Sequence, residues 1–294
     1  MPTLAIVIPY YKAEFFEQCL KSLADQTNKN FNVYIGDDCS PNSPDVILNQ
    51  FKNQLVINYH RFDSNLGSTY LTQQWDRCID LIQDEKWIML IGDDDELSEN
   101  VVEDFYNSLD EINNKNIQVV RANVTEIDGD NKVLREFVYP RFELSTSSYI
   151  KKIVSDYHIT LPEYIFSVSA YKKYGFVHFP FAFGSDNIAW LEFSEGKEIF
   201  TLPNGICYMR LSNFNISGDK SNVKDKVFAK YLTHQYIIKN LFNYFDVDQQ
   251  KIVIEKGYKY LLFSDSKNYK ERFSYLLRVK KNLNLNEIKT IFFS

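Results

Sequence analysis

Acidic side chains gather at one place in the sequence, the run Asp93-Asp94-Asp95-Glu96, which directly follows an apolar stretch. Four neighbouring carboxylates beside a buried strand repel one another, and this costs stability unless a cation or ordered hydrogen bonds compensate. Oxygen ligands suit Mg²⁺ or Mn²⁺, which proteins commonly hold with one or two carboxylates plus substrate phosphates. The run therefore predicts a divalent-cation site. The alternative is that Asp94 or Glu96 only caps the following helix.

Two earlier apolar stretches also end in residues that can bind a ligand. Pro9-Tyr10-Tyr11 follows the stretch Leu4–Ile8, and Asp37-Asp38-Cys39-Ser40 follows Val33–Gly36. In open parallel α/β sheets, ligands bind beyond the carboxyl ends of the strands. If these stretches are parallel strands, all three polar segments meet at one edge of the sheet.

The elements that must position these segments are visible as short apolar runs that alternate with helical periodicity. The run Leu4–Ile8 is continuous, which is typical of a strand buried on both faces. A helix is expected from about Glu14 to Asp25, because its apolar residues fall on one face. Further strands are expected at Val33–Gly36, Val56–Tyr59, Trp87–Ile91 and Gln118–Ala122, with intervening helices that open at Ser43-Pro44, near Leu71 and at Ser98.

This alternation predicts right-handed crossovers and therefore an α/β fold with a doubly wound, mostly parallel, Rossmann-like sheet. A hairpin around Asp128-Gly129-Asp130 extends it. From Tyr139 to Ser217 the periodicity is poor, and loops are expected. No proline follows Pro203, and the apolar spacing near the end predicts a helical appendage. We expect one domain at 1–218, with halves at about 1–125 and 126–218, and a C-terminal helical appendage at 219–294.

Composition narrows the class of protein. Over 294 residues, 45% of them hydrophobic, the chain is expected to be globular, and its net charge of -6 argues against nucleic-acid binding. From Lys251 onward, however, there are ten Lys and Arg residues against four Asp and Glu. The four cysteines lack metal-ligand or C-x-x-C spacing, so reduced, buried thiols are expected. Without a leader or a membrane span in the sequence, we expect a cytoplasmic protein, with peripheral contact at the inner face of the cell membrane through the basic C-terminal region as a further option.

Four motifs agree in order and spacing with a known family. Ile6-Val7-Ile8-Pro9-Tyr10-Tyr11 is similar to its opening strand, and Gly36-Asp37-Asp38-Cys39-Ser40-Pro41-Asn42-Ser43 to its D-D-x-S turn. Asn65-Leu66-Gly67 is similar to its N-x-G segment, and Asp93-Asp94-Asp95 to its D-x-D metal motif. From about Pro2 to Ser217 the chain resembles the family 2 glycosyltransferases. The resemblance implies a GT-A fold and an inverting enzyme that uses a nucleotide-sugar donor.

The resemblance also implies roles for individual residues. Pro9, Tyr11 and Asp38 would hold the nucleotide base and ribose, and Asn65 and Gly67 belong to the same nucleotide-binding set. Asp95 would ligate a Mn²⁺ or Mg²⁺ ion that bridges the diphosphate, while Asp93 or Asp94 would contact ribose or a metal-bound water. Gly92 departs from the family, in which many members have an acidic residue there. Which of Asp93 and Asp94 is the first Asp of the motif is therefore left open.

Two later segments complete the resemblance. Phe183 to Trp190 is similar to a G-E-D segment followed by an apolar helix, with Ser185 in place of Glu, which makes Asp186 the implied catalytic base. The alternative for Asp186 is a helix cap. Tyr208-Met209-Arg210, with Asn213, Asn215 and Ser217 after it, is similar to the family's Y-R loop. This likeness implies that Arg210 clamps the diphosphate, with a surface ion pair as the alternative.

The expected function is transfer of a sugar, from a UDP-sugar by resemblance, to a hydroxyl of a glycan or lipid-linked saccharide in cell-surface polysaccharide synthesis. The alternatives are a non-catalytic nucleotide-sugar-binding protein and, less favoured, a sugar nucleotidyltransferase. The latter would need a Gly-rich, Arg-containing loop after the first strand, and a dinucleotide-dependent oxidoreductase would need G-x-G-x-x-G there. The loop Pro9–Glu14 has neither pattern. The histidines His60, His158, His178 and His234 are expected to be structural or solvated, and only analogy suggests that His158–Phe166 lines an acceptor site.

Overall fold

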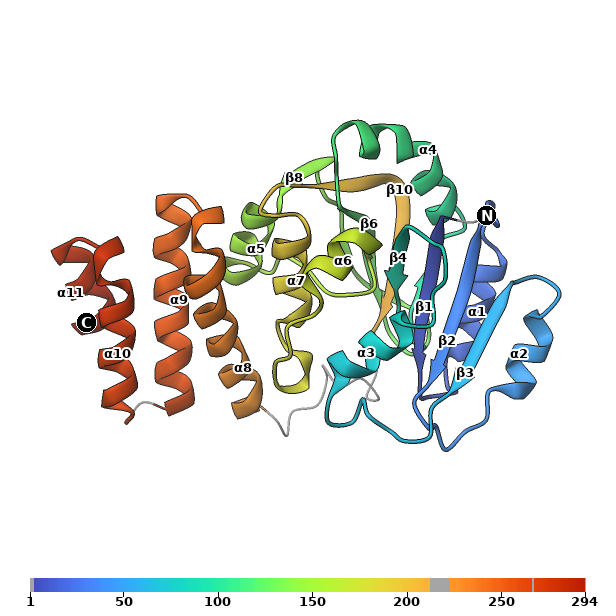
Figure 1. Ribbon diagram of the computed structural model, residues 1–294, viewed down its shortest axis with the longest axis horizontal. Helices are drawn as coiled ribbons and strands as arrows, with labels where there is room; N and C mark the ends of the chain where they lie inside the picture. Colours follow the sequence, from blue (N-terminus) through green and yellow to red (C-terminus); the bar gives the residue numbers. More distant parts are fainter. Residues whose placement is uncertain (1–2, 212–222, 266, 294) are drawn as a thin grey trace.

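The computed structural model of the chain describes residues 3–211, 223–265 and 267–293, and a ten-stranded sheet lies in the part of the molecule that holds the N-terminus (Figure 1). The strand order is β3-β2-β1-β4-β9-β6-β10-β5, with β7 beside β6 and β8 beside β10. The strands are β1 (Leu4–Tyr10), β2 (Phe31–Asp37), β3 (Ile57–Arg61), β4 (Trp87–Leu90), β5 (Glu96–Leu97), β6 (Val119–Ile127), β7 (Val133–Phe137), β8 (Phe142–Leu144), β9 (Tyr164–Ser167) and β10 (Glu198–Arg210).

The first half of the sheet is parallel, because β2 and β4 both pair in parallel with β1, and β3 pairs in parallel with β2. Strand β1 is buried on both faces, as its continuous apolar run predicts. Leu4, Ile6 and Ile8 pack in one core, whereas Ala5 and Val7 pack in the other. The carboxyl ends of β1, β2 and β4 therefore lie at one edge, which confirms the predicted convergence.

Beyond β4 the sheet is mixed. Strand β9 lies antiparallel between β4 and β6, and β10 runs parallel to β6. The predicted hairpin is present, since β7 pairs antiparallel with β6 and the amide of Asp128 donates to the carbonyl of Lys132 across the turn. The α/β fold is confirmed, and the expected parallel pairing applies to the first four strands.

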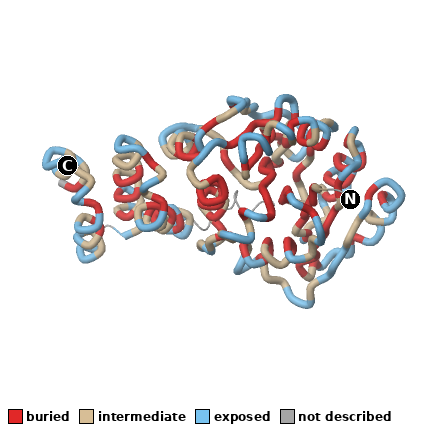
Figure 2. The backbone as a smooth tube through the Cα atoms, turned by 45° about the horizontal axis from the view of Figure 1, so that its top comes forward, coloured by how far each residue is buried: buried red, intermediate tan, exposed pale blue. Residues whose placement is uncertain are grey.

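Helices cover both faces of the sheet, as expected for a doubly wound fold. On one face lie α1 (Phe16–Ala24), α2 (Asp45–Phe51) and α4 (Val101–Asn114), and on the other α3 (Leu71–Ile79), α6 (Val168–Tyr174) and α7 (Ser185–Phe193). Figure 2 shows that buried residues gather in the interior of the molecule and that exposed residues lie mainly along its outline. All four cysteines are free thiols, as expected, and all but Cys39 are buried.

The C-terminal region is helical, which confirms the predicted appendage. Its helices α8 (Val223–Tyr236), α9 (Val247–Asp265), α10 (Tyr269–Val279) and α11 (Leu285–Phe293) extend to the side of the molecule away from β3 (Figure 1). Helix α8 continues into the π-helix η3 (Ile237–Leu241), and α9 packs on both α8 and α5 (Ser145–Val154). The expected boundary at 218 lies outside the described residues, so the domain division stays a prediction. Among the described residues, no helix combines the length and apolar character needed to cross a membrane.

Three local expectations are wrong. Helix α4 has Asn100 at its N-cap position, while the hydroxyl of Ser98 donates to the side chain of Asn100 and accepts from the amide of Ile206. Pro44 occupies the N-cap position of α2 rather than its first turn. The segment from Tyr139 onward, expected to be mostly loop, contains regular elements throughout its described part: β8, α5, β9, α6, α7 and β10.

Candidate functional site

A cavity of about 700 Å³ opens at the carboxyl ends of β1, β2 and β4. Its opposite wall comes from α5, the start of α7, and helices α8 and α9 of the C-terminal region. Every predicted site residue except Arg210 lines this cavity: Pro9, Tyr11, Asp38, Asn65, Gly67, Asp93, Asp94, Asp95 and Asp186. Carboxylates from distant parts of the chain thus share one space.

Asp38, at the end of β2, fastens the segment Asn65-Leu66-Gly67 to the sheet. Its carboxylate accepts hydrogen bonds from the amides of Leu66 (2.6 Å) and Gly67 (2.9 Å) and from the side chain of Asn65 (3.1 Å). Arg77 of α3 adds an ion pair to the same group. Both predicted motifs therefore meet, but the Asp38 carboxylate in this structure serves mainly to hold the cavity wall.

Asp93 holds the loop after β1 in the same way. Its Oδ2 accepts hydrogen bonds from the backbone amides of Tyr11 and Lys12, both at 2.7 Å. Burial and the neighbouring charge of Asp94 raise the pKa of Asp93 to about 7. This contact joins the acidic run after β4 to the segment after β1, so Asp93 shapes the cavity floor.

Asp94 and Asp95 form a close pair over Gly92. An added Cβ at Gly92 would lie 2.7 Å from Oδ1 of Asp94 and 2.8 Å from Oδ2 of Asp95, so glycine is required for both carboxylates to converge there. Burial raises the pKa of Asp94 and, with the charge of Asp94, raises that of Asp95 well above its usual range. Asp95 accepts hydrogen bonds from the amides of Gly92 (3.1 Å) and Arg210 (3.2 Å), and the charges of Lys12 and Arg210 act to lower the pKa of Asp94. Both pKa values stay raised despite these contacts, so the protein compensates the pair only in part.

A divalent cation fits the chemistry of this pair, because two carboxylates, which are hard oxygen ligands, lie close together and make the site negatively charged. Within residues 3–211, 223–265 and 267–293, no group of three or more His, Cys, Asp or Glu side chains is arranged to hold a metal ion. Mg²⁺ and Mn²⁺ commonly need only one or two carboxylates when substrate phosphates supply further oxygens. The ion therefore stays a prediction.

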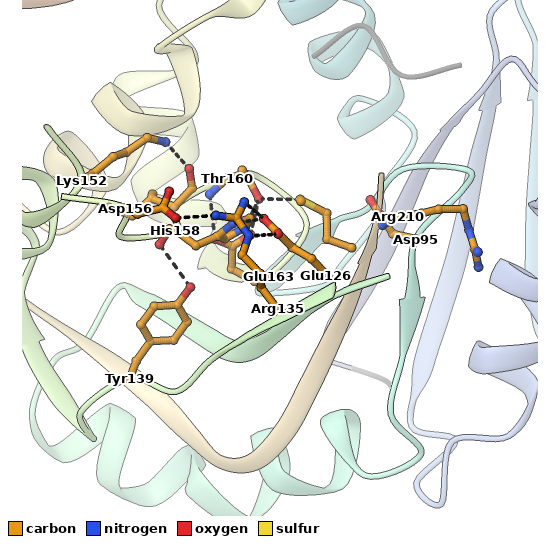
Figure 3. A network of polar contacts seen from close by, with 12 residues as sticks. Asp95, Glu126, Arg135, Tyr139, Lys152, Asp156, His158, Thr160, Glu163 and Arg210 are labelled. Atoms are coloured by element: carbon orange, nitrogen blue, oxygen red, sulfur yellow. Dashed lines mark hydrogen bonds and ion pairs between the residues drawn. The ribbon is translucent and has the colours of Figure 1, made fainter. Parts of the chain in front are cut away.

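Arg210, at the end of β10, does not line the cavity. Its side chain is fully buried and donates to the carbonyls of Asp94 (3.1 Å) and Asp128 (2.8 Å) and to the side chain of Asn131 (2.6 Å), with an ion pair to Glu96. Figure 3 shows the side chain running away from the cluster of polar residues around Thr160. In this structure the side chain ties the acidic run to the β6–β7 turn, and its expected role as a diphosphate clamp stays a prediction. Asn213, Asn215 and Ser217 of the same motif lie outside the described residues.

Asp186 is the second residue of α7. The N-cap position is held by Gly184, whose φ of 95° lies in the left-handed region that favours glycine. Asp186 Oδ1 accepts from the amide (2.8 Å) and the side chain (2.6 Å) of Asn187, so the carboxylate is oriented by its neighbour without being the cap. Burial raises the pKa of Asp186, and the charge of Lys152 opposes this.

A loop between α5 and β9 closes another side of the cavity through Thr160, Leu161 and Pro162. Figure 3 shows the polar network that holds it. Glu163, which is fully buried, accepts from the amide and hydroxyl of Thr160, both at 2.7 Å, and His158 contacts Thr160 at 3.0 Å. The indole of Trp190 in α7 donates to the Thr160 carbonyl at 3.1 Å. The network ties this loop to the helix that carries Asp186.

Several cavity residues were missed by sequence reasoning. Lys12 and Lys152 line it, as do Lys230, Thr233 and His234 of α8 and Tyr260 of α9. Lys12 follows a recognised motif, so its position along the chain was a usable signal. No sequence signal indicated that α8 and α9 contribute to the cavity, because helical spacing alone does not reveal which helix face meets a distant sheet edge.

The comparisons with known proteins agree with this geometry. Residues 5–177 match the profile of the family described as Glycosyl transferase family 2. Residues 1–349 of S. aureus TarS in complex with UDP-GlcNAc match with a TM-score of 0.67 at 16% identity, covering 99% of this chain and 82% of that one. The same TarS segment in complex with UDP matches with a TM-score of 0.63 at 16% identity, covering 99% of this chain and 78% of that one. A longer TarS chain matches with a TM-score of 0.65 at 15% identity, covering 99% of this chain and 50% of that one. At such identities the likeness shows the fold alone. No curated protein sequence matches this chain significantly.

Proposed function

We propose, on the premise that this chain belongs to family 2 of the glycosyltransferases, that it transfers a sugar from a nucleoside-diphosphate sugar to an acceptor hydroxyl with inversion. The observation that carries the proposal is that Asp38, Asp95 and Asp186 line one cavity although they lie far apart in the sequence. The first two border the part of the cavity at the sheet edge, and the third lies on the opposite wall. This arrangement suits a nucleotide at the sheet and an acceptor beside Asp186.

The proposed donor is a UDP-sugar. The supporting observation is the fold shared with TarS, whose structures contain UDP-GlcNAc and UDP. In this chain Pro9, Tyr11 and the segment held by Asp38 line the part of the cavity where a base and ribose would lie. UDP-GlcNAc is therefore the first donor to test.

We propose that the transfer depends on Mn²⁺ or Mg²⁺ held by Asp95, with Asp94 beside it. A bound cation would act as a Lewis acid that neutralises charge on the departing diphosphate. The convergence of both carboxylates over Gly92 and the raised pKa values of the pair support this assignment. Asp93 contributes by holding the amides of Tyr11 and Lys12 beside the same place.

Asp186 is proposed to act as the general base. Its carboxylate takes the proton of the acceptor hydroxyl as that oxygen attacks the anomeric carbon, while the bond from this carbon to the diphosphate breaks and the nucleoside diphosphate leaves with the electron pair. Burial raises the pKa of Asp186, which makes the carboxylate a stronger base than an exposed one. General-base assistance contributes about 10² to 10⁴ in rate, or roughly 3 to 5 kcal/mol.

The proposed acceptor is a glycan or lipid-linked saccharide of a cell-surface polysaccharide pathway. Peripheral membrane contact is part of this proposal, supported by exposed aromatic side chains among the basic residues of the C-terminal helices. Phe263, Tyr269 and Phe273 are 81%, 72% and 62% exposed. Such faces suit an anionic lipid surface. The chain should co-sediment with phosphatidylglycerol vesicles in low salt but not with phosphatidylcholine vesicles, and equal behaviour with both would reject electrostatic membrane contact.

The test of the function uses UDP-GlcNAc with Mn²⁺ and measures donor binding and transfer of the sugar to water, followed as UDP release, for the wild type and Asp186→Asn. We expect the variant to bind donor normally and to lose transfer by about two orders of magnitude or more. Asp130→Asn, a change at an exposed turn position, is the matched control. Undiminished transfer by Asp186→Asn would reject Asp186 as base. Donor binding by the wild type without any turnover would instead favour the non-catalytic binding protein.

A further inference from the structure

The end of the cavity farthest from β2 is formed by side chains of the C-terminal helices and α5. His234 of α8 lies between two tyrosine rings there, with ring centroids 6.0 Å from Tyr149 and 5.2 Å from Tyr260. All three residues line the cavity. His234 is only 2% exposed, so its polar atoms must find partners within the cavity or the protein.

The tautomer of His234 follows from its one observed hydrogen bond. Its Nδ1 lies 2.8 Å from the carbonyl oxygen of Lys230. Because a carbonyl can only accept, Nδ1 carries the proton and Nε2 presents a lone pair. Burial lowers the pKa of His234 to about 4, so the ring is neutral near pH 7. Nε2 is therefore a hydrogen-bond acceptor.

This acceptor is unsatisfied. Within the part of the chain that the structure describes, Nε2 of His234 has no hydrogen-bond partner, and neither does the buried Oδ1 of Asn187. Asn187 also lines the cavity, and its side-chain nitrogen donates to Asp186. Two buried acceptors that lack donors thus belong to residues that line the same cavity as the proposed base, and one of these residues is adjacent to it.

Helices α7 and α8 are held together next to this place. An added Cβ at Gly184 would lie 2.2 Å from the hydroxyl oxygen of Thr233, so the start of α7 contacts α8 directly. Asp186 follows Gly184 by two residues and His234 follows Thr233. The contact therefore fixes the unsatisfied imidazole relative to the helix turn that bears the proposed base.

We propose that His234 Nε2 and Asn187 Oδ1 accept hydrogen bonds from hydroxyl groups of the acceptor saccharide, so that the C-terminal helices build the acceptor subsite. This assignment rests on the proposed function. Both atoms need a hydrogen donor, which a diphosphate lacks and a polyhydroxylated molecule has in abundance. The half-buried ring of Tyr260 beside His234 supplies apolar surface for a remaining face of a sugar.

The first experiment compares the thermal stability of the unliganded wild type, His234→Phe and His234→Gln. Phenylalanine keeps the ring packing and removes both the unsatisfied acceptor and the hydrogen bond from Nδ1 to the Lys230 carbonyl, so the two effects should offset each other and His234→Phe should melt close to the wild type. A stability loss well above the roughly 1 kcal/mol of that one hydrogen bond would mean that Nε2 has a structural partner, which would overturn the proposal. His60→Phe, at an exposed position, is the control.

The second experiment follows the imidazole nitrogen resonances of His234 by NMR during titration with methyl β-D-glucopyranoside and, separately, D-glucitol. Donation of a hydroxyl to Nε2 should shift its resonance, and that of His60 should stay in place. The dissociation constant of the bound probe should rise about tenfold in His234→Phe, for one lost hydrogen bond, and change by less than about threefold in His234→Gln. No shift with either probe would overturn the proposal.

A third measurement separates this proposal from the proposed function. UDP-GlcNAc is titrated into the wild type alone, and its binding is measured together with the His234 resonances. If UDP-GlcNAc itself shifts Nε2, the subsite belongs to the donor sugar and the acceptor assignment is wrong. If UDP-GlcNAc fails to bind while the glucoside shifts Nε2, the proposed donor fails but the hydroxyl-binding site stands.

Discussion

Removal of the Asp38 carboxylate is the sharpest test of how the nucleotide side of the cavity is held. Asp38→Ala leaves the backbone amides of Leu66 and Gly67, the side chain of Asn65 and the guanidinium of Arg77 without their common acceptor. Asp38 is 4% exposed, so water cannot replace the lost oxygens easily. The substitution should therefore affect both folding and ligand binding.

The magnitude follows from what is left behind. Breaking a buried ion pair from one side typically costs about 3 to 5 kcal/mol, because the other partner stays desolvated. Arg77 retains 21% side-chain exposure and can partly regain water, so we expect about 3 kcal/mol. In a chain of this size such a loss lowers the melting temperature by roughly 5 °C.

The assay is urea unfolding of the wild type, Asp38→Ala and the exposed control Asp63→Ala, together with UDP titration under native conditions. Asp38→Ala should lose stability and bind UDP at least tenfold more weakly, because the segment Asn65-Leu66-Gly67 is no longer fastened. Asp63→Ala should match the wild type in both. A loss below about 1 kcal/mol for Asp38→Ala would refute the claim that this carboxylate holds the wall.

Two further predictions concern the acidic run and His234. Asp95→Ala should abolish the dependence of UDP-GlcNAc binding on Mn²⁺, measured by calorimetry with and without EDTA, and a retained dependence would place the ion elsewhere. The folded-state pKa of His234 is lowered from 6.5 to about 4, so the unfolded chain binds the proton more readily than the folded one. The free energy of unfolding should therefore fall by at most about 3 kcal/mol as the pH drops from about 6.5 to about 4. His234→Phe should lose less stability over that interval in urea unfolding, and identical losses in both proteins would contradict the shifted pKa.

The first half of the fold could be predicted because local and global signals agree there. The alternation of apolar runs and amphipathic helices up to Leu90 is continuous. The runs that form β1, β2 and β4 are buried on both faces, whereas the edge strand β3 is largely exposed. Strand β10 was not predicted because Pro203 and Gly205 interrupt it, and its pairing with β6 shifts register between Thr201 and Ile206. An irregularity in a strand erases the period-two pattern on which such predictions depend.

The candidate site could be predicted for residues that directly follow the parallel strands, but not for residues whose position depends on the packing of other elements. Asp38, Asp93 and Asp95 follow β2 and β4, so topology alone places them at one edge. Arg210 has a recognisable sequence context and the β6–β7 turn was predicted, yet no motif specifies that the Arg210 side chain is buried against Asp94 and Asp128. His234 belongs to a helix whose orientation depends on tertiary packing, as at Gly184 and Thr233.

The close fit of Gly184 against Thr233 bears on how enzymes with this architecture diversify. One wall of the cavity is formed by the edge of the parallel sheet, and the other is formed by helices that follow the sheet in the chain. Substitutions on the cavity-facing sides of α8 and α9 leave the sheet edge untouched, so we expect lineages to change the acceptor there while retaining one nucleotide. Gly184 limits that freedom, since any larger residue pushes α8 aside and carries Asp186 out of line.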